Sequence, residues 1–290
     1  MNVVLADVLG YCMGVRRAMD FALDSLEKNT DKTVYSLGPL IHNQTALDSL
    51  EEKGLKVLPE AEIETIEKNS VVVIRAHGIP PATMECLNRR ECTVVNATCP
   101  RVLASQKNAA KYAGLGYTVI LAGDKNHGEV TGIAGFAGKN FILVERLEDA
   151  VNLRHFDDSE EAVLLSQTTF GQEEFEAIRS VLSEKIKNLK VFNTICSATR
   201  ERQEALHRLC PSADGILVVG GKNSANTKRL LQIAEENCRR AALIETSAEI
   251  PEDFFKMNTV GITAGASTPD DVIEDVVHEL KQKGDRAKTL

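Results

Sequence analysis

Short runs of β-branched and apolar residues alternate with longer segments of helical period along almost all of the 290 residues. The short runs predict strands over residues 2–6, 33–36, 71–75, 93–97, 117–123, 141–144, 162–165, 189–193, 215–221, 241–245 and 259–264. The amphipathic segments between them predict helices, among them 14–28, 99–114, 172–188 and 197–210. Because strands that alternate with helices of this length form parallel sheets covered on both faces, the pattern predicts a doubly wound α/β fold.

A weak internal repeat divides the chain into three parts. Three times a predicted strand ends in a short turn that carries a cysteine, and a predicted helix follows: Cys12 in "VVLADVLGYCMGVRRA", Cys99 in "TVVNATCPRV" and Cys196 in "LKVFNTICSATRERQ". Within each interval another strand ends in a polar loop that contains glycine. Open α/β sheets place ligands outside the carboxyl ends of their strands, so three modules that face one another would share one centre. We predict modules over residues 13–96, 97–193 and 194–290, with the N-terminal strand, 1–12, pairing into the third.

The charge and composition argue against several classes of function. A net charge of −8 disfavours a nucleic-acid surface, because phosphate backbones require a basic face. Aromatic residues make up 4% of the chain and tryptophan is absent, so stacking on exposed bases is poorly supported. No apolar run approaches the roughly 18 residues that span a bilayer, and the first residues do not resemble a signal peptide. We expect a cytoplasmic protein without a nucleic-acid or membrane partner.

The seven cysteines indicate packing, catalysis or metal binding, because cytosolic thiols are kept reduced. A single buried cysteine is usually a small hydrophobic residue. Cys12, Cys99 and Cys196 instead occupy equivalent strand ends near helix starts, where the thiolate is favoured and can bind a soft metal. A four-iron cluster held by three cysteines would leave one iron without a protein thiolate and open to substrate. The remaining cysteines fit a structural role: Cys86, Cys92, Cys210 and Cys238.

Polar loops at other strand ends are candidates for an anion site. Three histidines lie in loops with small residues: His42, His77 and His127. Imidazoles grouped in this way can form charge-assisted hydrogen bonds to phosphate. The loops "GGKNSANTKRL" and "TAGASTPDDVI" each lead from a strand into a helix start, where free backbone amides attract anions. In the first loop the alternative is that Ser224 or Asn226 serves only as a helix cap. Neither loop matches the nucleotide-triphosphate motif.

One carboxyl and one hydroxyl are candidates for proton delivery. Glu129 stands two residues after His127, so both side chains can reach one centre from a tight loop. A carboxyl group in a low-dielectric site has a raised pKa and can donate a proton near neutral pH. Thr168, in "SQTTF", can relay a proton through its hydroxyl, and turn formation is the equally supported alternative.

Several motifs together resemble the 4-hydroxy-3-methylbut-2-enyl diphosphate reductase family, whose members complete the non-mevalonate isoprenoid pathway. The matching stretches are "GYCMGVRRA", "IHN", "AHG", "NATCP", "HGEVTG", "SQTT", "TICSATRERQEA", "VVGGKNSANTKRL" and "TAGAST". Each is weak alone, but they follow in order from residue 10 to 268. The resemblance therefore covers nearly the whole chain and is specific.

The resemblance implies a reductive dehydroxylation that uses two electrons and two protons and gives isopentenyl and dimethylallyl diphosphate. It implies three modules around a central 4Fe-4S cluster, bound by Cys12, Cys99 and Cys196, and an electron donor such as ferredoxin or flavodoxin. The implied binding residues of the diphosphate substrate are His42, His77, His127, Thr168, Ser224, Asn226 and Ser267. Glu129 is implied as the proton-delivery group, with Thr168 nearby and His127 in the same catalytic set.

Two positions depart from the pattern that this family shows. Ala225 stands where many members carry a second serine, and Gly128 stands where proline is frequent. Neither change removes a cluster ligand. We therefore expect these departures to alter affinity rather than the type of reaction.

Three other interpretations remain open from the residues. A hydratase or dehydratase also uses three cysteines and an open iron, but it needs no electrons. A redox or iron sensor would bind a cluster without catalysis, although the acidic chain offers no evident DNA-binding element. A plain α/β protein with structural cysteines would bind no iron.

Overall fold

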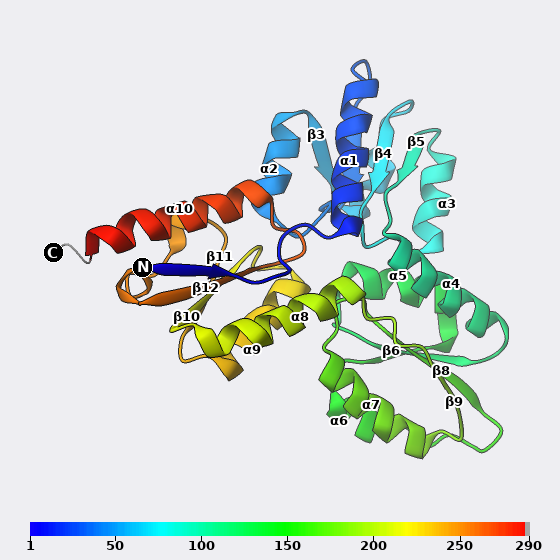
Figure 1. Ribbon diagram of the computed structural model, residues 1–290. Helices are drawn as coiled ribbons and strands as arrows, with labels where there is room; N and C mark the ends of the chain where they lie inside the picture. The colour runs from blue at the N-terminus through cyan, green and yellow to red at the C-terminus, as the bar shows by residue number, and fades with distance from the viewer. Residues whose placement is uncertain (288–290) are drawn as a thin grey trace. The chain divides into compact units, whose positions relative to one another are not determined.

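The computed structural model describes residues 1–287, which form three four-stranded parallel sheets (Figure 1). The first sheet contains β2 (Val34–Leu37), β3 (Leu55–Leu58), β4 (Val71–Ile74) and β5 (Thr93–Asn96). The second contains β6 (Thr118–Ala122), β7 (Phe141–Val144), β8 (Glu161–Ser166) and β9 (Asn188–Val191). The third contains β1 (Asn2–Leu5), β10 (Gly215–Val219), β11 (Ala241–Ile244) and β12 (Thr259–Ala264). These sheets confirm the predicted α/β class and its three modules.

All ten α-helices of the described residues lie between strands or at the end of the chain. Those before β6 are α1 (Met13–Lys28), α2 (Gln44–Glu52), α3 (Pro81–Arg89) and α4 (Pro100–Gly114). The others are α5 (Gly128–Ala137), α6 (Leu147–Val151), α7 (Gln172–Lys185), α8 (Ser197–Leu209), α9 (Ala225–Asn237) and α10 (Asp270–Ala287). Short 3-10 turns cover Glu60–Thr65, Gly138–Asn140, Cys210–Ser212, Ser247–Glu249 and Phe254–Lys256.

The three sheets share one strand order. The first runs β3-β2-β4-β5, the second β7-β6-β8-β9, and the third, read in the same direction, β11-β10-β12-β1. The N-terminal strand β1 thus takes the fourth position of the third sheet, where Asn2 pairs with Thr259 and Leu5 with Ile262. In every sheet the order reverses between the two central strands, which creates the switch point where α/β folds bind ligands.

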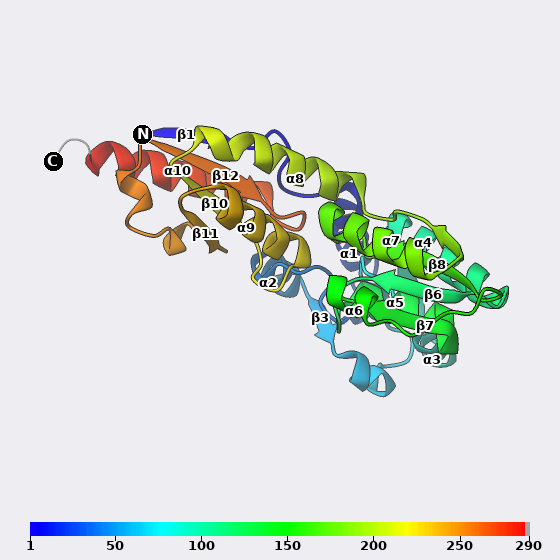
Figure 2. The same cartoon turned by 90° about the horizontal axis from the view of Figure 1, so that it is seen from below.

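Helices cover both faces of the second and third sheets. In the second sheet, a core with Tyr112, Val130 and Val163 lies under α4 and α5, whereas a core with Phe170, Phe175 and Leu182 lies under α7. Figure 1 shows α4 and α5 on one side of this sheet and α6 and α7 on the other. In the third sheet, α8 and α9 pack on one face and α10 on the other (Figure 2). The buried strand residues follow from their runs of valine, isoleucine and leucine.

Contacts divide the chain into two compact units. The terminal unit comprises Met1–Arg16, His42–Ser49 and the described residues from Ser197 onward. The central unit comprises Arg17–Ile41 and Leu50–Cys196, and it holds the first and second sheets. The predicted module boundaries near residues 97 and 193 stay predictions. Within residues 1–287, no helix is both long and apolar enough to cross a membrane.

Candidate active site

The candidate residues follow particular strands of each sheet. The loops after the two central strands carry His42 and His77 in the first sheet. In the second sheet the same loops carry His127 with Glu129, and Thr168; in the third they carry Ser224 with Asn226, and Ser267. These are the loops at the switch point of each sheet, where the carboxyl ends of neighbouring strands open a ligand site. The repeat in the sequence therefore corresponds to a repeated strand order, with candidate residues in equivalent loops of each sheet.

Each of the three strand-end cysteines follows the fourth strand of its sheet, and its backbone makes an equivalent hydrogen bond in each module. The Cys99 N–H donates to the Ala76 carbonyl at 3.0 Å, beside His77. The Cys196 N–H donates to the Thr168 carbonyl at 2.9 Å, and the Cys12 N–H donates to the Ala266 carbonyl at 3.0 Å, beside Ser267. These bonds extend each parallel ladder past the strand ends. Each thiol is thereby fixed next to a loop that carries a candidate binding residue.

The strand-end cysteines differ from most of the others in their position and, for Cys12, in the contact that its sulfur makes. The Val15 N–H donates to the Cys12 sulfur at 3.5 Å, and Cys12, Cys99 and Cys196 stand at or just before the starts of α1, α4 and α8. In contrast, three other thiols donate to oxygen atoms: Cys86 to Glu64, Cys92 to Leu87 and Cys238 to Ala213. All seven cysteines are free of disulfide bonds.

Burial of the remaining cysteine, Cys210, raises the pKa of its thiol to about 11. Burial also raises the pKa of Cys92, and the hydrogen bond to Glu64 raises that of Cys86. Groups with raised thiol pKa values are poor metal ligands, because the thiolate is the ligand form. These cysteines fit the structural role that their sequence positions indicate.

Glu129 and Thr168 form a buried polar contact in the central unit. Glu129 is 1% exposed, and its carboxylate accepts hydrogen bonds from the Thr168 N–H at 2.8 Å and the Thr168 hydroxyl at 2.7 Å. Burial raises the pKa of Glu129 to about 7, although the two bonds from Thr168 oppose the shift. Because that value lies near neutral pH, the carboxyl can both hold and release a proton there.

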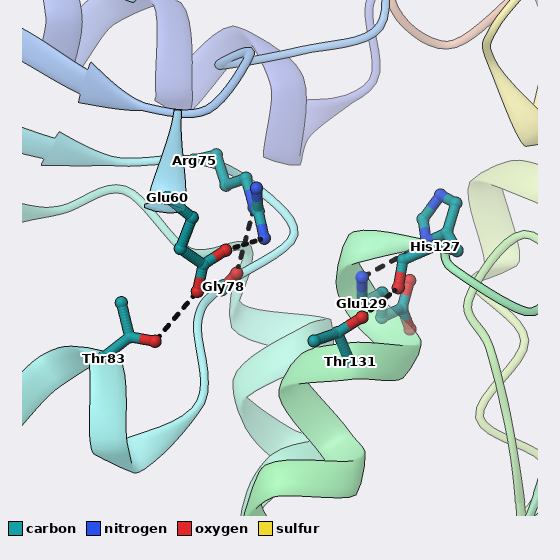
Figure 3. Close-up of polar contacts among 7 residues, drawn as sticks. All are labelled: Glu60, Arg75, Gly78, Thr83, His127, Glu129 and Thr131. Atoms are coloured by element: carbon teal, nitrogen blue, oxygen red, sulfur yellow. Dashed lines mark hydrogen bonds and ion pairs between the residues drawn. The ribbon is translucent and has the colours of Figure 1, made fainter. Parts of the chain in front are cut away.

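His127 caps the helix that carries Glu129. Its Nδ1 accepts the Glu129 N–H at 3.2 Å at the start of α5, so in the neutral ring the proton is on Nε2 (Figure 3). The His77 ring meets the His127 ring edge to face, with centroids 5.1 Å apart. The central unit therefore brings His77, His127, Glu129 and Thr168 together. A neutral His127 offers its Nε2–H to an acceptor beside the buried carboxyl.

Arg75, which is not among the predicted site residues, contacts the loops of His77 and His127. Its guanidinium binds Glu60 at 3.1 Å and donates to the Gly78 carbonyl at 3.3 Å, and Glu60 also accepts from Thr83 (Figure 3). A Cβ at Gly128 would lie 3.3 Å from this guanidinium, so the glycine lets Arg75 approach the His127 loop closely. The strand end "IRAHG" carried the signal, because a charged residue directly before the His77 loop needs a partner.

In the terminal unit, His42 meets the loops of the third sheet. Its carbonyl accepts the Ser267 hydroxyl at 3.1 Å. A Cβ at Gly221 would lie 2.3 Å from the same carbonyl oxygen, so only glycine allows this close approach of two backbones. The terminal unit therefore brings His42, Ser267 and the loop of Ser224 together.

Ser224 and Asn226 differ in how their polar atoms are used. Ser224 is the N-cap of α9 and accepts the Thr227 N–H at 3.3 Å, which leaves its hydroxyl hydrogen for another acceptor. Asn226 is 2% exposed, and neither its side-chain nitrogen nor its oxygen has a hydrogen-bond partner among the described residues. An unsatisfied buried amide costs about 1–3 kcal/mol unless a ligand or water pairs with it. The first turn of α9 thus holds a polar group suited to a ligand.

Comparisons with known proteins agree over nearly the full length. The model of the LytB protein family matches residues 3–281. A 4-hydroxy-3-methylbut-2-enyl diphosphate reductase of Treponema denticola is 46% identical, with 97% of this chain and 99% of the relative aligned. A reductase of the same name from Caldanaerobacter subterraneus subsp. tengcongensis is 41% identical over 97% of each chain.

A solved structure supports the same relationship. The E-1-hydroxy-2-methyl-but-2-enyl-4-diphosphate reductase from Plasmodium falciparum superposes with a TM-score of 0.90 at 28% identity, covering 96% of this chain and 87% of that one. Sequence and fold therefore agree over all three sheets. The chain belongs to the LytB protein family.

Proposed function

We propose that the protein reduces 4-hydroxy-3-methylbut-2-enyl diphosphate to isopentenyl and dimethylallyl diphosphate. Two electrons and two protons replace the hydroxyl group, the carbon–oxygen bond breaks, one carbon–hydrogen bond forms, and water leaves. Family membership and the names of the full-length relatives support this reaction. The observation that carries the chemistry is the buried Glu129–Thr168 pair, which holds an exchangeable proton near neutral pH.

The residues at the strand ends fit an iron–sulfur cluster, which the LytB family implies. The donor set is Cys12, Cys99 and Cys196, three thiols without disulfide bonds at helix starts, and this soft set suits a 4Fe-4S cluster with one iron lacking a protein thiolate. When bound, such a cluster supplies electrons and a Lewis-acidic iron for the carbon–oxygen bond. The equivalent backbone bonds of the three cysteines fix the positions from which each thiol reaches a metal.

The diphosphate is proposed to bind the hydrogen-bond donors of the switch-point loops. The proposed contacts are His42, His77, His127, Ser224, Asn226 and Ser267. The amide of Asn226 supplies an N–H without an internal partner, and the hydroxyls of Ser224 and Ser267 can turn toward an oxygen. The starts of helices α5 and α9 add backbone amides that favour negative charge.

Glu129 is proposed to deliver the proton to the departing hydroxyl oxygen. In its protonated form it donates from a dry site, and the Thr168 hydroxyl can pass the proton onward because it contacts the carboxylate at 2.7 Å. The His127 Nε2–H orients an acceptor beside it, and the bond from the Glu129 N–H fixes this tautomer. Water exclusion follows from the burial of Glu129 and Thr168.

The electron donor is proposed to be a ferredoxin or flavodoxin, and the protein is proposed to act in the cytoplasm. Both follow from the pathway reaction and stay predictions. Among the alternatives, the hydratase needs no electrons, and the sensor needs no buried acid such as Glu129. Membership of the LytB family favours an iron–sulfur protein over the iron-free interpretation.

An anaerobic assay tests the proposal. Iron-quantified protein is mixed with reduced methyl viologen and 4-hydroxy-3-methylbut-2-enyl diphosphate, and both dye oxidation and products are followed. We expect both isopentenyl and dimethylallyl diphosphate, with two dye molecules oxidised for each product molecule. Protein that holds about four irons per chain but gives no product would overturn the reductase. Hydration of the substrate without dye oxidation would favour the hydratase.

A further inference from the structure

One continuous segment of this acidic protein contains no acidic residue. The chain has 42 Asp and Glu residues and a net charge of −8, yet residues 92–123 carry none. The charged residues of this segment are Arg101, Lys107 and Lys111, all on α4. The helix that follows on the same face of the second sheet, α5, has one acidic residue, Glu129, which is buried. This face of the sheet is therefore locally basic.

The basic residues of α4 lie on its exposed side. Arg101, Lys107 and Lys111 are exposed, as is Ala104 between them, whereas Val102, Ala109 and Tyr112 face the core. We call the exposed residues Arg101, Ala104, Lys107 and Lys111 the α4 face. Among the described residues, none forms an ion pair with its three cations. Leu115, just after the helix, is 61% exposed and adds an apolar contact at the end of this face.

Two of these cations do not serve the helix itself, whereas Lys111 lies in the last turn, where the negative end of the helix dipole favours a cation. Arg101 lies in the first turn of α4, where the positive end of the helix dipole disfavours a cation. Lys107 and Lys111 are four residues apart, a spacing at which like charges repel. Helix stability therefore does not explain Arg101 and Lys107, and an outside partner with negative charge would explain all three cations.

The opposite face of the same sheet has the opposite charge. Helix α7 carries four acidic residues and two basic ones, and α6 adds Glu148 and Asp149. Both faces belong to the same sheet of the same acidic protein. The overall charge of the protein therefore does not explain why the face with α4 is basic. The positive charge is confined to α4. This helix starts at Pro100, directly after its N-cap, Cys99.

We propose that the α4 face docks an acidic electron-transfer protein that reduces this enzyme. The proposal rests on the proposed function, which requires two electrons for each turnover. A donor on this face lies against the helix whose first residue follows a proposed cluster ligand, so docking brings the donor to that ligand's side of the protein. Transient redox partners bury small interfaces and rely on charge for orientation and speed, which suits a single basic helix.

The test compares two triple variants that change the net charge equally. The first replaces Arg101, Lys107 and Lys111 by glutamate. The control, Lys32→Glu/Lys53→Glu/Arg239→Glu, reverses three exposed cations that precede β2, β3 and β11, at the amino ends of the strands. Each protein is loaded with its cluster. Two reductants are compared, reduced methyl viologen and a reduced plant-type two-iron ferredoxin, and the Kd of oxidised ferredoxin is measured by calorimetry at low and high salt.

We expect the α4 variant to raise the Kd and the KM for ferredoxin about tenfold or more at low salt and to lose most of the salt dependence. Its rate with viologen should stay within about twofold of the wild type, which also shows that the variant folds and holds its cluster. The control should match the wild type in every measurement. The single variant Lys107→Glu should give an intermediate Kd.

The outcomes separate this proposal from the proposed function. An active viologen reaction with an unchanged ferredoxin Kd in the α4 variant overturns the docking proposal alone. An equal loss in the α4 and control variants also overturns it, because net charge would then be the cause. If a short DNA duplex binds the α4 face and ferredoxin does not, the face is a polyanion site and the proposal is wrong. No product with viologen in the wild type overturns both proposals.

Discussion

The second and third sheets share a strand order and an equivalent cysteine bond, but their switch-point loops carry different chemistry. Above the second sheet, Glu129 is a buried acid with a pKa of about 7, held by Thr168. Above the third sheet, Ser224, Asn226 and Ser267 offer hydroxyls and an amide, none of which titrates near neutral pH. We therefore propose that the loops of the second sheet include the proton-transfer group and that the loops of the third sheet bind the anion. This difference predicts that substitutions of Glu129 or Thr168 lower kcat, whereas substitutions in the loops of the third sheet raise the KM for the substrate.

The largest expected effect comes from removing the acid. Glu129→Gln keeps the shape and can keep the contacts with Thr168, but it has no proton to deliver. We expect kcat to fall by about 10²–10⁴-fold with a nearly unchanged KM, measured with reduced viologen. Glu173→Gln, an exposed carboxyl on α7, is the matched control and should behave as the wild type. Near-normal turnover of the Glu129 variant would remove this residue from proton delivery.

The same substitution should change how stability depends on pH. The pKa of Glu129 is about 7 in the folded protein against a usual value of 4.5, so below pH 4.5 the carboxyl is protonated in both states. Between these values the unfolded chain ionises first, and the free energy of unfolding falls as pH rises, by on the order of 3 kcal/mol in total. The free energy of unfolding of Glu129→Gln should not fall in this way, because glutamine does not ionise.

Urea denaturation of wild type and Glu129→Gln at several pH values between 5 and 8 checks this prediction. The stability advantage of the variant should grow as pH rises and level off above pH 7. A constant difference across the range would mean that the pKa of the carboxyl is not raised in the folded protein.

In the third sheet, Asn226→Ala should weaken substrate binding with little loss of turnover. A hydrogen bond to a charged group contributes about 1.5–3 kcal/mol, so KM should rise roughly tenfold or more. Stability should not fall, because the amide has no internal partner to lose among the described residues. Asn223→Ala, an exposed residue of the same loop, is the control. Lower stability with an unchanged KM would make Asn226 a structural residue.

The smallest effect is expected for Ala225→Ser. Ala225 is half-buried at the first position of α9, between Ser224 and Asn226, so a hydroxyl there adds one donor beside the proposed diphosphate. We expect KM to fall about two- to threefold and kcat to stay unchanged, measured in the same assay. A lower kcat would place this loop in the chemical step and weaken the contrast between the sheets.

Most of the fold could be predicted because its strands are short apolar runs between polar helices. The exception is β3 (Leu55–Leu58), which the sequence analysis did not predict. Its sequence "LKVL" is four residues long, contains one β-branched residue and carries an exposed lysine, so its pattern resembles a loop. It lies at the edge of the first sheet, where pairing with β2 rather than its own pattern creates the strand.

The candidate site could be predicted as a set of residues but not as a set of contacts. Glu129 and Thr168 are separated by 39 positions, so their bond depends on the neighbouring positions of β6 and β8 in the sheet. The bond from the Glu129 N–H to His127 also depends on a local backbone geometry that spacing does not reveal. Arg75 was missed because the fold brings its partners together: Glu60 lies in the 3-10 turn after β3, and the Gly78 carbonyl lies in the turn after β4. The residue types in the sequence indicate which chemistry is available, whereas the strand order determines which side chains come into contact.

The pairing of β1 with β12 has a consequence for the order in which the protein is made. Chains emerge from the ribosome amino end first and fold in that direction, so the strand made first waits for a partner made almost last. Cys99 and Cys196 bond to residues made before them, but the Cys12 N–H has no acceptor until Ala266 has been added. The thiol nearest the start of the chain is therefore the last to reach its place, and iron supplied before synthesis ends would meet an incomplete set of the proposed ligands.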